Sequence, residues 1–360
     1  MLKKAFLLTS IACFGFANQT TYSQNNLPSQ HKVKGYVVKN HPILFNANLL
    51  IGQISASPVN YLQTIHTPPF FAPNLFFDFT KTAFPEKIDV GFRFGLGIGL
   101  DNHVNVSAQW TWFYTKDWAE KRFTAPTGGN LFIQIPIMPF DTPADGASFE
   151  NKNAIAKAHQ ALRYQTLDFL AQTASWMLSS NIRFQPFGGI RLFYFKRDLV
   201  ATLIDVDENT SATINNHFKL RGSGVLIGTD IKYLFSKRFF FFSNVMAGIL
   251  GGYETRDLSA NTNLTGDPLE VYTFTFHERF HLSFDSMYEV RLGFAFETPI
   301  RKQGLLSFYL AYEFSSMVHT QAKAIVPVAP VSTFDEINTP IRTNDVIKTQ
   351  FGVLGATIAF

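Results

Sequence analysis

The segment His277-Glu278-Arg279-Phe280-His281 carries residue types and a spacing that could do metal chemistry. In a zinc protease the pattern H-E-x-x-H lies on a helix, where both histidines bind one ion and the glutamate acts as general base. Here the segment lies inside a stretch of alternating polar and apolar residues, which predicts a strand. On a strand the two histidines would lie about 13 Å apart, too far to bind one ion, and Glu278 would point away from them. We interpret the match as chance and expect no metal; a helix over 274–284 would reverse this interpretation.

The surrounding stretch, residues 272–297, alternates with a period of two over nearly its whole length. One set of alternate positions is aromatic or aliphatic and the other is polar or small, so a strand here would have one apolar face and one polar face. The stretch holds roughly 26 residues, or about 85 Å of extended chain, which exceeds the usual strand of a soluble sheet. Similar alternation occurs in residues 88–100, 103–115, 182–194, 225–233 and 306–315.

Composition limits the class of protein. The chain has 39 Phe, 15% aromatic residues and 16% charged residues, whereas average usage is about 25% charged. No uninterrupted apolar run approaches the roughly 20 residues of a membrane-spanning helix. The chain is therefore predicted to be either a β protein with a large core or a membrane β-barrel.

The N-terminus has the layout of a secretory signal peptide. Lys3 and Lys4 precede an apolar run over 5–16, and small residues lead to a cleavage site after Ala17. Cys13 allows a lipoprotein signal as the alternative. We therefore predict a signal peptide over 1–17, a lead-in over 18–42 and one barrel domain over 43–360. Cys13 is the single cysteine, so a mature chain would have no disulfide and no thiolate ligand. The net charge of +4 would fall to about +2 on cleavage, which does not indicate a nucleic-acid partner.

Connections between the alternating segments are short and long in turn. Short connections are expected at 101–102, 173–180, 236–237 and 301–304, and long ones at 116–157, 198–216, 255–270 and 320–346. This pattern is typical of outer-membrane barrels, and in lipid only helices and closed barrels satisfy every backbone polar group. We predict an all-β transmembrane, antiparallel up-and-down barrel of about ten to twelve strands, with short periplasmic turns and long extracellular loops. A short helix over 153–162 and a phase change near 166–167 are left open.

Several side chains have candidate roles in such a barrel. Aromatic residues gathered at one strand end predict a membrane-interface girdle, namely Trp110, Trp112, Tyr114 and Trp118. A terminal aromatic on a closing strand, Phe360, is interpreted as an assembly signal. The candidates for residues facing the lumen are Arg93, Arg183, Arg191, Lys232, His277, Arg279, His281, Glu289, Arg291, Glu297 and Glu313. Charges of both signs predict little ion preference, or else pairing that fills a narrow lumen.

Glycines at 95, 97 and 99 share the polar face of their segment. They end in a turn rather than opening a helix, so they do not form a dinucleotide-binding motif. They either leave room for a neighbouring side chain or an inward loop, or allow curvature. No arrangement of residues suggests catalysis, and we predict no enzyme activity, no catalytic residue and no cofactor.

Short pieces in order along the chain resemble one protein family. They are Gly91-Phe92-Arg93-Phe94-Gly95-Leu96, Trp110-Thr111-Trp112-Phe113, Gln185-Pro186-Phe187-Gly188-Gly189-Ile190-Arg191, Gly222-Ser223-Gly224 through Gly228, Arg291-Leu292-Gly293, Ala311-Tyr312-Glu313 and Phe351-Gly352 through Phe360. Together they are similar to the Legionella-type major outer membrane protein family, pore-forming proteins also found in chlamydia-like bacteria. The resemblance implies a barrel porin and supplies no catalytic residues. The lack of cysteine in the mature chain departs from disulfide-linked relatives of that group.

These observations lead to two functional hypotheses for a protein of the bacterial outer membrane. The first is a porin for passive diffusion of small solutes and ions. The second is a closed structural barrel, or an adhesin acting through its extracellular loops, without an open pore. The expected partners are outer-membrane lipid, the barrel-assembly machinery and small solutes, with a homo-oligomer left open and no nucleic acid.

Overall fold

The computed structural model describes residues 43–57, 60–67, 78–84, 87–100, 104–124, 130–134, 148–150, 153–207, 210–263, 271–300, 304–319 and 346–360. The expected signal peptide and lead-in, residues 1–42, lie outside these ranges. Within the ranges, every regular element is a β-strand. None of the described residues form a helix with the length and apolarity needed to cross a membrane.

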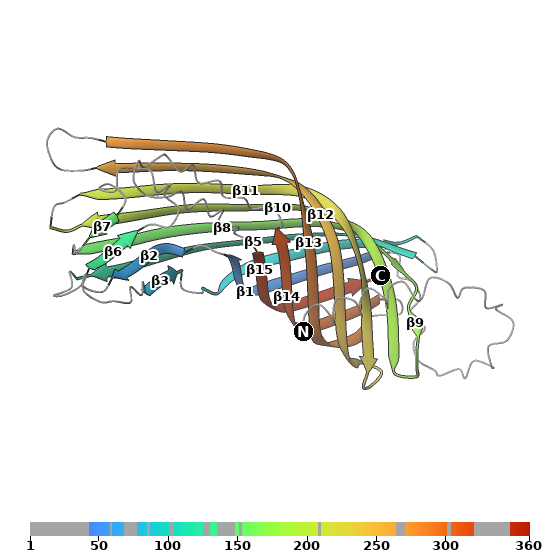
Figure 1. Cartoon of the computed structure of the whole chain (residues 1–360). Coiled ribbons are helices and arrows are strands. Elements are labelled where there is room, and N and C mark those ends of the chain that lie inside the picture. The colour runs from blue at the N-terminus through green and yellow to red at the C-terminus, as the bar shows by residue number, and fades with distance from the viewer. Residues whose placement is uncertain are drawn as a thin grey trace. The chain divides into compact units, whose positions relative to one another are not determined.

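Ten strands form a closed antiparallel barrel, as the sequence predicts (Figure 1). In spatial order each strand pairs with the next, and the pairing of β10 with β11 closes the ring. The barrel strands are β1 (Ile43–Ser57), β4 (Asp89–Gly99), β5 (Val104–Phe123), β8 (Ala154–Thr173), β10 (Ile182–Asp205), β11 (Ser211–Leu234), β12 (Phe239–Asn263), β13 (Val271–Ile300), β14 (Gly304–His319) and β15 (Val346–Ala359). Where all ten strands overlap, closure leaves no unpaired edge, which is what a hydrocarbon environment requires.

The connections carry short strands of their own. β2 (Asn60–Thr67), β3 (Asp78–Ala83), β6 (Asn130–Gln134) and β7 (Ser148–Glu150) form a separate sheet in the order β3-β2-β6-β7. These strands come from the β1–β4 and β5–β8 connections, so two long connections are joined by hydrogen bonds between β2 and β6. The two-residue β9 (Trp176–Met177) pairs with the start of β10.

Alternation along each strand decides which side chains face outward. On β4 the arginine at 93 is buried inside the barrel, while the large apolar residues on both sides of it are exposed on the outside. The same division between faces holds on β13 from Phe284 onward. The apolar face therefore meets lipid, and the polar face lines the interior, as predicted. The outward apolar residues around β4 are Ile88, Val90, Phe92, Phe94, Leu96, Ile98 and Leu100.

Strand lengths divide the barrel into two adjacent groups. The neighbours β14, β15, β1 and β4 hold 16, 14, 15 and 11 residues. The other six strands hold between 20 and 30 residues. A membrane span needs about 9–11 tilted residues. Hydrogen-bonded pairing continues to the short turns in β4–β5, β11–β12 and β13–β14. The extra residues of the six longer strands therefore lie on the long-loop side.

Two of the predicted long connections are shorter than expected, because β5 continues to Phe123, β8 begins at Ala154 and β12 continues to Asn263. The prediction of a loop over 198–216 is wrong. These residues form a hairpin in which β10 pairs with β11 as far as Ile204 and Ser211. On its inner face Leu199, Leu203 and Ile214 are fully buried. Polar residues occupy the outer face beyond the lipid, so the average composition is that of a loop although the alternation is that of a strand.

The two open readings of residues 153–172 are also resolved. β8 pairs without a register shift with β5 on one side and β10 on the other, so neither a helix nor a bulge occurs there. Small buried residues at 154, 156 and 158 continue the inward positions of the strand. A register shift of the barrel lies instead in β12, between Gly252 and Glu254.

Candidate functional site: the barrel interior

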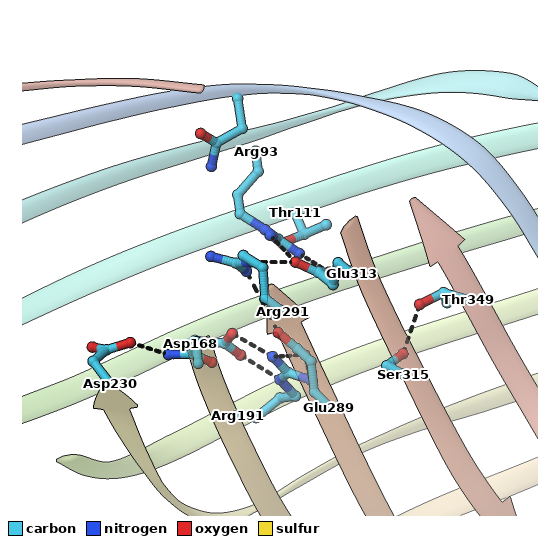
Figure 2. A network of polar contacts seen from close by, with 12 residues as sticks. Arg93, Thr111, Asp168, Arg191, Asp230, Glu289, Arg291, Glu313, Ser315 and Thr349 are labelled. Carbon is cyan, nitrogen blue, oxygen red and sulfur yellow. Dashed lines mark hydrogen bonds and ion pairs between the residues drawn. The ribbon is translucent and has the colours of Figure 1, made fainter. Parts of the chain in front are cut away.

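Six ionisable side chains meet inside the barrel (Figure 2). All are on inward positions of their strands, and together they form what we call the charged layer. Its members are Arg93 on β4, Asp168 on β8, Arg191 on β10, Glu289 and Arg291 on β13, and Glu313 on β14. Alternation places each of them on the inner face, but only closure of the barrel brings strands far apart in sequence into contact.

The carboxylate of Glu313 binds two arginines. Arg93 donates from Nη1 and Nη2 to the two Glu313 oxygens, each at 2.6 Å, and its Nε donates to Thr111 Oγ1 at 2.9 Å. Arg291 donates from Nε to Glu313 Oε2 at 2.6 Å. β15 and β1 lie between the strands of Arg93 and Glu313, so this bidentate pair crosses the lumen rather than following the barrel wall.

A second pair of contacts crosses the lumen from Arg191. Its Nε and Nη2 donate to the two Asp168 oxygens, each at 2.6 Å, along the wall between β10 and β8. Nη1 and Nη2 of the same guanidinium lie 3.2 Å from Glu289 Oε2 on β13, with β11 and β12 between the two strands. Arg291 Nη2, 3.5 Å from Glu289 Oε1, connects the two halves of the charged layer.

The formal charges of the layer cancel, because three arginines face three carboxylates. Arg93, Arg191, Glu289 and Glu313 each have a side chain no more than 4% exposed. Charges removed from water in this way are stable only when paired and hydrogen-bonded. The layer therefore fills the cross-section with mutually dependent ion pairs instead of leaving one sign of charge to attract ions.

Apolar side chains pack beside the charged layer, mostly toward the long loops. Phe113 on β5 and Phe351 on β15 contact each other across the lumen, with ring centroids 4.8 Å apart. Both are buried in a cluster that includes Leu50, Leu162 and Phe195 and draws side chains from every barrel strand except β4. On β4, Gly91 leaves space for the Phe113 ring, because a Cβ at this position would lie only 2.5 Å from Phe113 Cδ2. This side of the interior is a packed core.

The short-turn side of the interior mixes half-exposed polar side chains with buried apolar ones such as Phe187, Leu226 and Phe240. Asn46, Ser107 and Gln109 are only partly buried on inward positions. Lys232 Nζ lies 3.9 Å from Glu297 Oε1, and their side chains are 38% and 24% exposed. We call this end of the interior, between the charged layer and the short turns, the vestibule.

The predicted lumen residues divide into four groups. Five of them, Arg93, Arg191, Glu289, Arg291 and Glu313, form most of the charged layer, and Lys232 and Glu297 lie in the vestibule. Arg183 lies directly opposite Lys232 across the β10–β11 pair and has no contact with the layer among the described residues. His277, Arg279 and His281 belong to the strand β13, and their side chains lie outside the described part. Their backbone is the strand that the sequence predicts, and no metal-binding cluster occurs among the described side chains.

Sequence reasoning missed Asp168 and Thr111. Asp168 lies in the stretch where a phase change was left open, which concealed its inward position. The available signal was the period of two along the strand, because Asp168 shares its inward face with Thr166 and Leu162. Thr111 lies on the polar face of its segment, but its neutral side chain keeps it out of a set of charged candidates.

The predicted girdle and terminal residue lie at the barrel surface. Trp110, Trp112, Tyr114 and Trp118 occupy outward positions of β5. Trp112 stacks with Tyr114 at 6.4 Å and with Phe92 at 6.3 Å between ring centroids. Phe360 donates its backbone N–H to Ile43 O at 3.0 Å, and its ring packs edge-on against Phe45. The terminal residue is thus joined to the first described residue of β1.

Comparisons with known proteins give one informative match. Residues 54–358 match the family model described as Legionella pneumophila major outer membrane protein precursor. A search of curated proteins finds no match. Similar solved structures include the outer membrane protease OmpT from Escherichia coli (11% identity, 88% of this chain and 96% of that chain, TM-score 0.34). Another is the P. putida toluene transporter TodX (10% identity, 88% of this chain and 89% of that chain, TM-score 0.27). A third is a Pseudomonas aeruginosa FadL homologue (8% identity, 89% of this chain and 90% of that chain, TM-score 0.22). At such low TM-scores these likenesses carry no argument, and the fold rests on the strand pairing.

Proposed function

Because its match spans most of the chain, this protein belongs to the Legionella major outer membrane protein family, and we propose that it is a structural barrel with a closed resting lumen. Membership of the family places it in the bacterial outer membrane. The observation that carries the proposal is the buried Arg93–Glu313 pair, which joins β4 to β14 across the lumen. No catalytic role is part of the proposal.

A hydrated ion would have to displace several charge-assisted contacts to pass this level. The bidentate pairs of Arg93 and Arg191 have short distances and little exposure to water, the conditions under which such contacts are strongest. Breaking one would leave an unpaired buried charge, which typically costs about 3–5 kcal/mol. A ten-strand barrel also has little interior room for both the side chains and a solute. These features favour a structural barrel with a closed lumen over a permanently open porin.

A second candidate is a porin in which the charged layer acts as a gate. The vestibule favours it, because half-exposed polar residues such as Gln109 and Lys232 line part of the interior between the short turns and the layer. Under this hypothesis small solutes enter from the short-turn side and cross when the ion pairs rearrange. The passive-diffusion hypothesis from the sequence corresponds to a layer that opens often.

Conductance in planar bilayers separates the two candidates. We expect the folded wild-type protein to give no steady current, and the double variant R93A/E313A to give channels because the cross-lumen pair is gone. The matched control is K232A/E297A, which removes a pair of charges from the vestibule and should stay silent. Folding of each sample is verified by heat-modifiable gel migration.

Steady ohmic current from the wild type would contradict the closed barrel and support passive diffusion. Voltage-dependent openings in the wild type that become permanent in R93A/E313A would support the gate. A silent double variant that is folded would show that the pair does not obstruct the lumen, and the apolar core beside it would then be the barrier to test.

A further inference from the structure

A row of basic side chains crosses the outward face of three neighbouring strands. Arg163 on β8 pairs in register with Lys196 on β10, and Lys196 pairs in register with Lys219 on β11. Their chain neighbours Leu162, Phe195 and Leu220 are buried inside, so the three cations point outward. We call these three residues the basic row. Arg221 lies two residues from Lys219 on the same outward face, one row nearer the short turns.

Cations directly opposite each other on a sheet repel, so the basic row is unfavourable without an anion. Asp198 balances part of it, at 2.5 Å from Lys196 Nζ and 2.7 Å from His217 Nδ1. Asp257 lies opposite His217 on β12. Among the described residues, Arg163, Lys219 and Arg221 form no ion pair; the Arg163 guanidinium lies 5.9 Å from the centroid of the Tyr114 ring. Within the described part of the chain, these three cations thus face outward without a carboxylate partner.

The position of the basic row relative to the membrane indicates the kind of anion. Two residues along each strand toward the short turns, the next row of outward side chains is mostly aromatic. In order across the strands it holds Trp112, Gln165, Tyr194, Arg221 and Tyr253. Below them come the exposed apolar residues Leu192, Ile190 and Val225. Aromatic rows mark the boundary between hydrocarbon and water in barrels. The basic row therefore lies at the headgroup level of the outer leaflet.

We propose that this face binds a phosphorylated outer-leaflet lipid, with its phosphate groups on the basic row and its acyl chains on the apolar face below. Guanidinium groups bind phosphate in a bidentate manner, and lysines add point charge. Opposite residues on neighbouring strands are about 5 Å apart, so one phosphate can contact two or three of these side chains. The proposal is independent of whether the lumen is open.

Lipid binding by the purified, folded protein in neutral phosphatidylcholine nanodiscs tests the proposal. The probe is lipid A, compared with dephosphorylated lipid A and with inorganic phosphate. We expect lipid A to bind, and R163Q/K219Q to bind it at least about tenfold more weakly (about 1.4 kcal/mol), because the variant loses two charged contacts to phosphate. The control K157Q/R122Q removes two outward cations of β8 and β5 farther from the membrane, and should stay within about twofold of wild type.

Three results would overturn the proposal. They are equal binding of lipid A by R163Q/K219Q, equal binding of dephosphorylated lipid A, and displacement of lipid A by inorganic phosphate at similar concentration, which would indicate a site for free anions. Heat-modifiable migration verifies that each variant is folded. If the double variant does not fold, the single variant K219Q and the weakening of wild-type binding by added salt provide the same test.

Discussion

Glu313 accepts hydrogen bonds from two guanidinium groups, and no other carboxylate of the charged layer contacts more than one arginine at less than 3 Å. All three cations of the layer are arginines. Because guanidinium is planar and presents several donors, it can bind one carboxylate through two contacts and still reach a third group, as Arg93 does with Thr111. A lysine at 93 would supply charge without this geometry.

At the scale of single residues we predict strong coupling between Arg93 and Glu313. In a double-mutant cycle with R93Q and E313Q, each single change should destabilise the folded barrel by several kcal/mol, because it leaves a buried charge with one partner fewer. The coupling energy should be about 1–3 kcal/mol. The measurement is urea unfolding in lipid vesicles.

The control cycle pairs R93Q with S316A, since Ser316 lies on the outward face of β14. Its effects should be additive. A coupling near zero for Arg93 and Glu313 would show that the cross-lumen pair does not hold in the folded protein.

At the scale of the strand, small inner-face residues make room for rings from neighbouring strands. A Cβ at Gly91 on β4 would meet both the Phe113 ring at 2.5 Å and the Trp112 carbonyl oxygen at 2.6 Å. At Gly95, four residues along the same strand, the nearest atom is Asn46 Cβ at 3.3 Å. Both glycines lie on the inner face of β4, so the effect of adding a side chain at either position depends on the neighbouring atoms.

We therefore expect G91A to destabilise the barrel by about 1–3 kcal/mol, as overpacking of a filled core does. G95A is the matched control on the same face and should cost clearly less, because a small shift of Asn46 relieves the contact. Unfolding in urea measures both. Equal losses would mean that backbone flexibility of β4, rather than the space beside Phe113, explains these glycines.

At the scale of the molecule, stability comes from ring closure and interior packing rather than from cross-links. Ten strands pair all the way round, and Cys13 is the single cysteine. We predict that the folded protein migrates differently on gels before and after boiling, and that reducing agent changes neither this shift nor the unfolding midpoint. A midpoint lowered by reducing agent would contradict the prediction and indicate a disulfide between copies.

The alternation, the short and long connections and the low charge were enough to predict an outer-membrane barrel, because lipid imposes a period of two on every spanning strand. They also identified most of the charged layer. An arginine at 93 or 191 lies on the polar face of its strand, and this face must line the interior because the other face meets lipid. They failed at 198–216, where the strands extend beyond the lipid. There the outer face meets water, so polar residues are no longer evidence of a loop.

The contacts across the lumen could not be predicted from local pattern. Alternation places Arg93 and Glu313 on the inner face, but which inward charges meet depends on the number of strands, their register and the curvature of the closed sheet. The same holds for Arg163, Lys196 and Lys219, whose alignment exists only in the register of three strands. Sequence pattern thus specifies the face of each side chain, whereas closure of the barrel specifies its partners, because those partners lie far away along the chain.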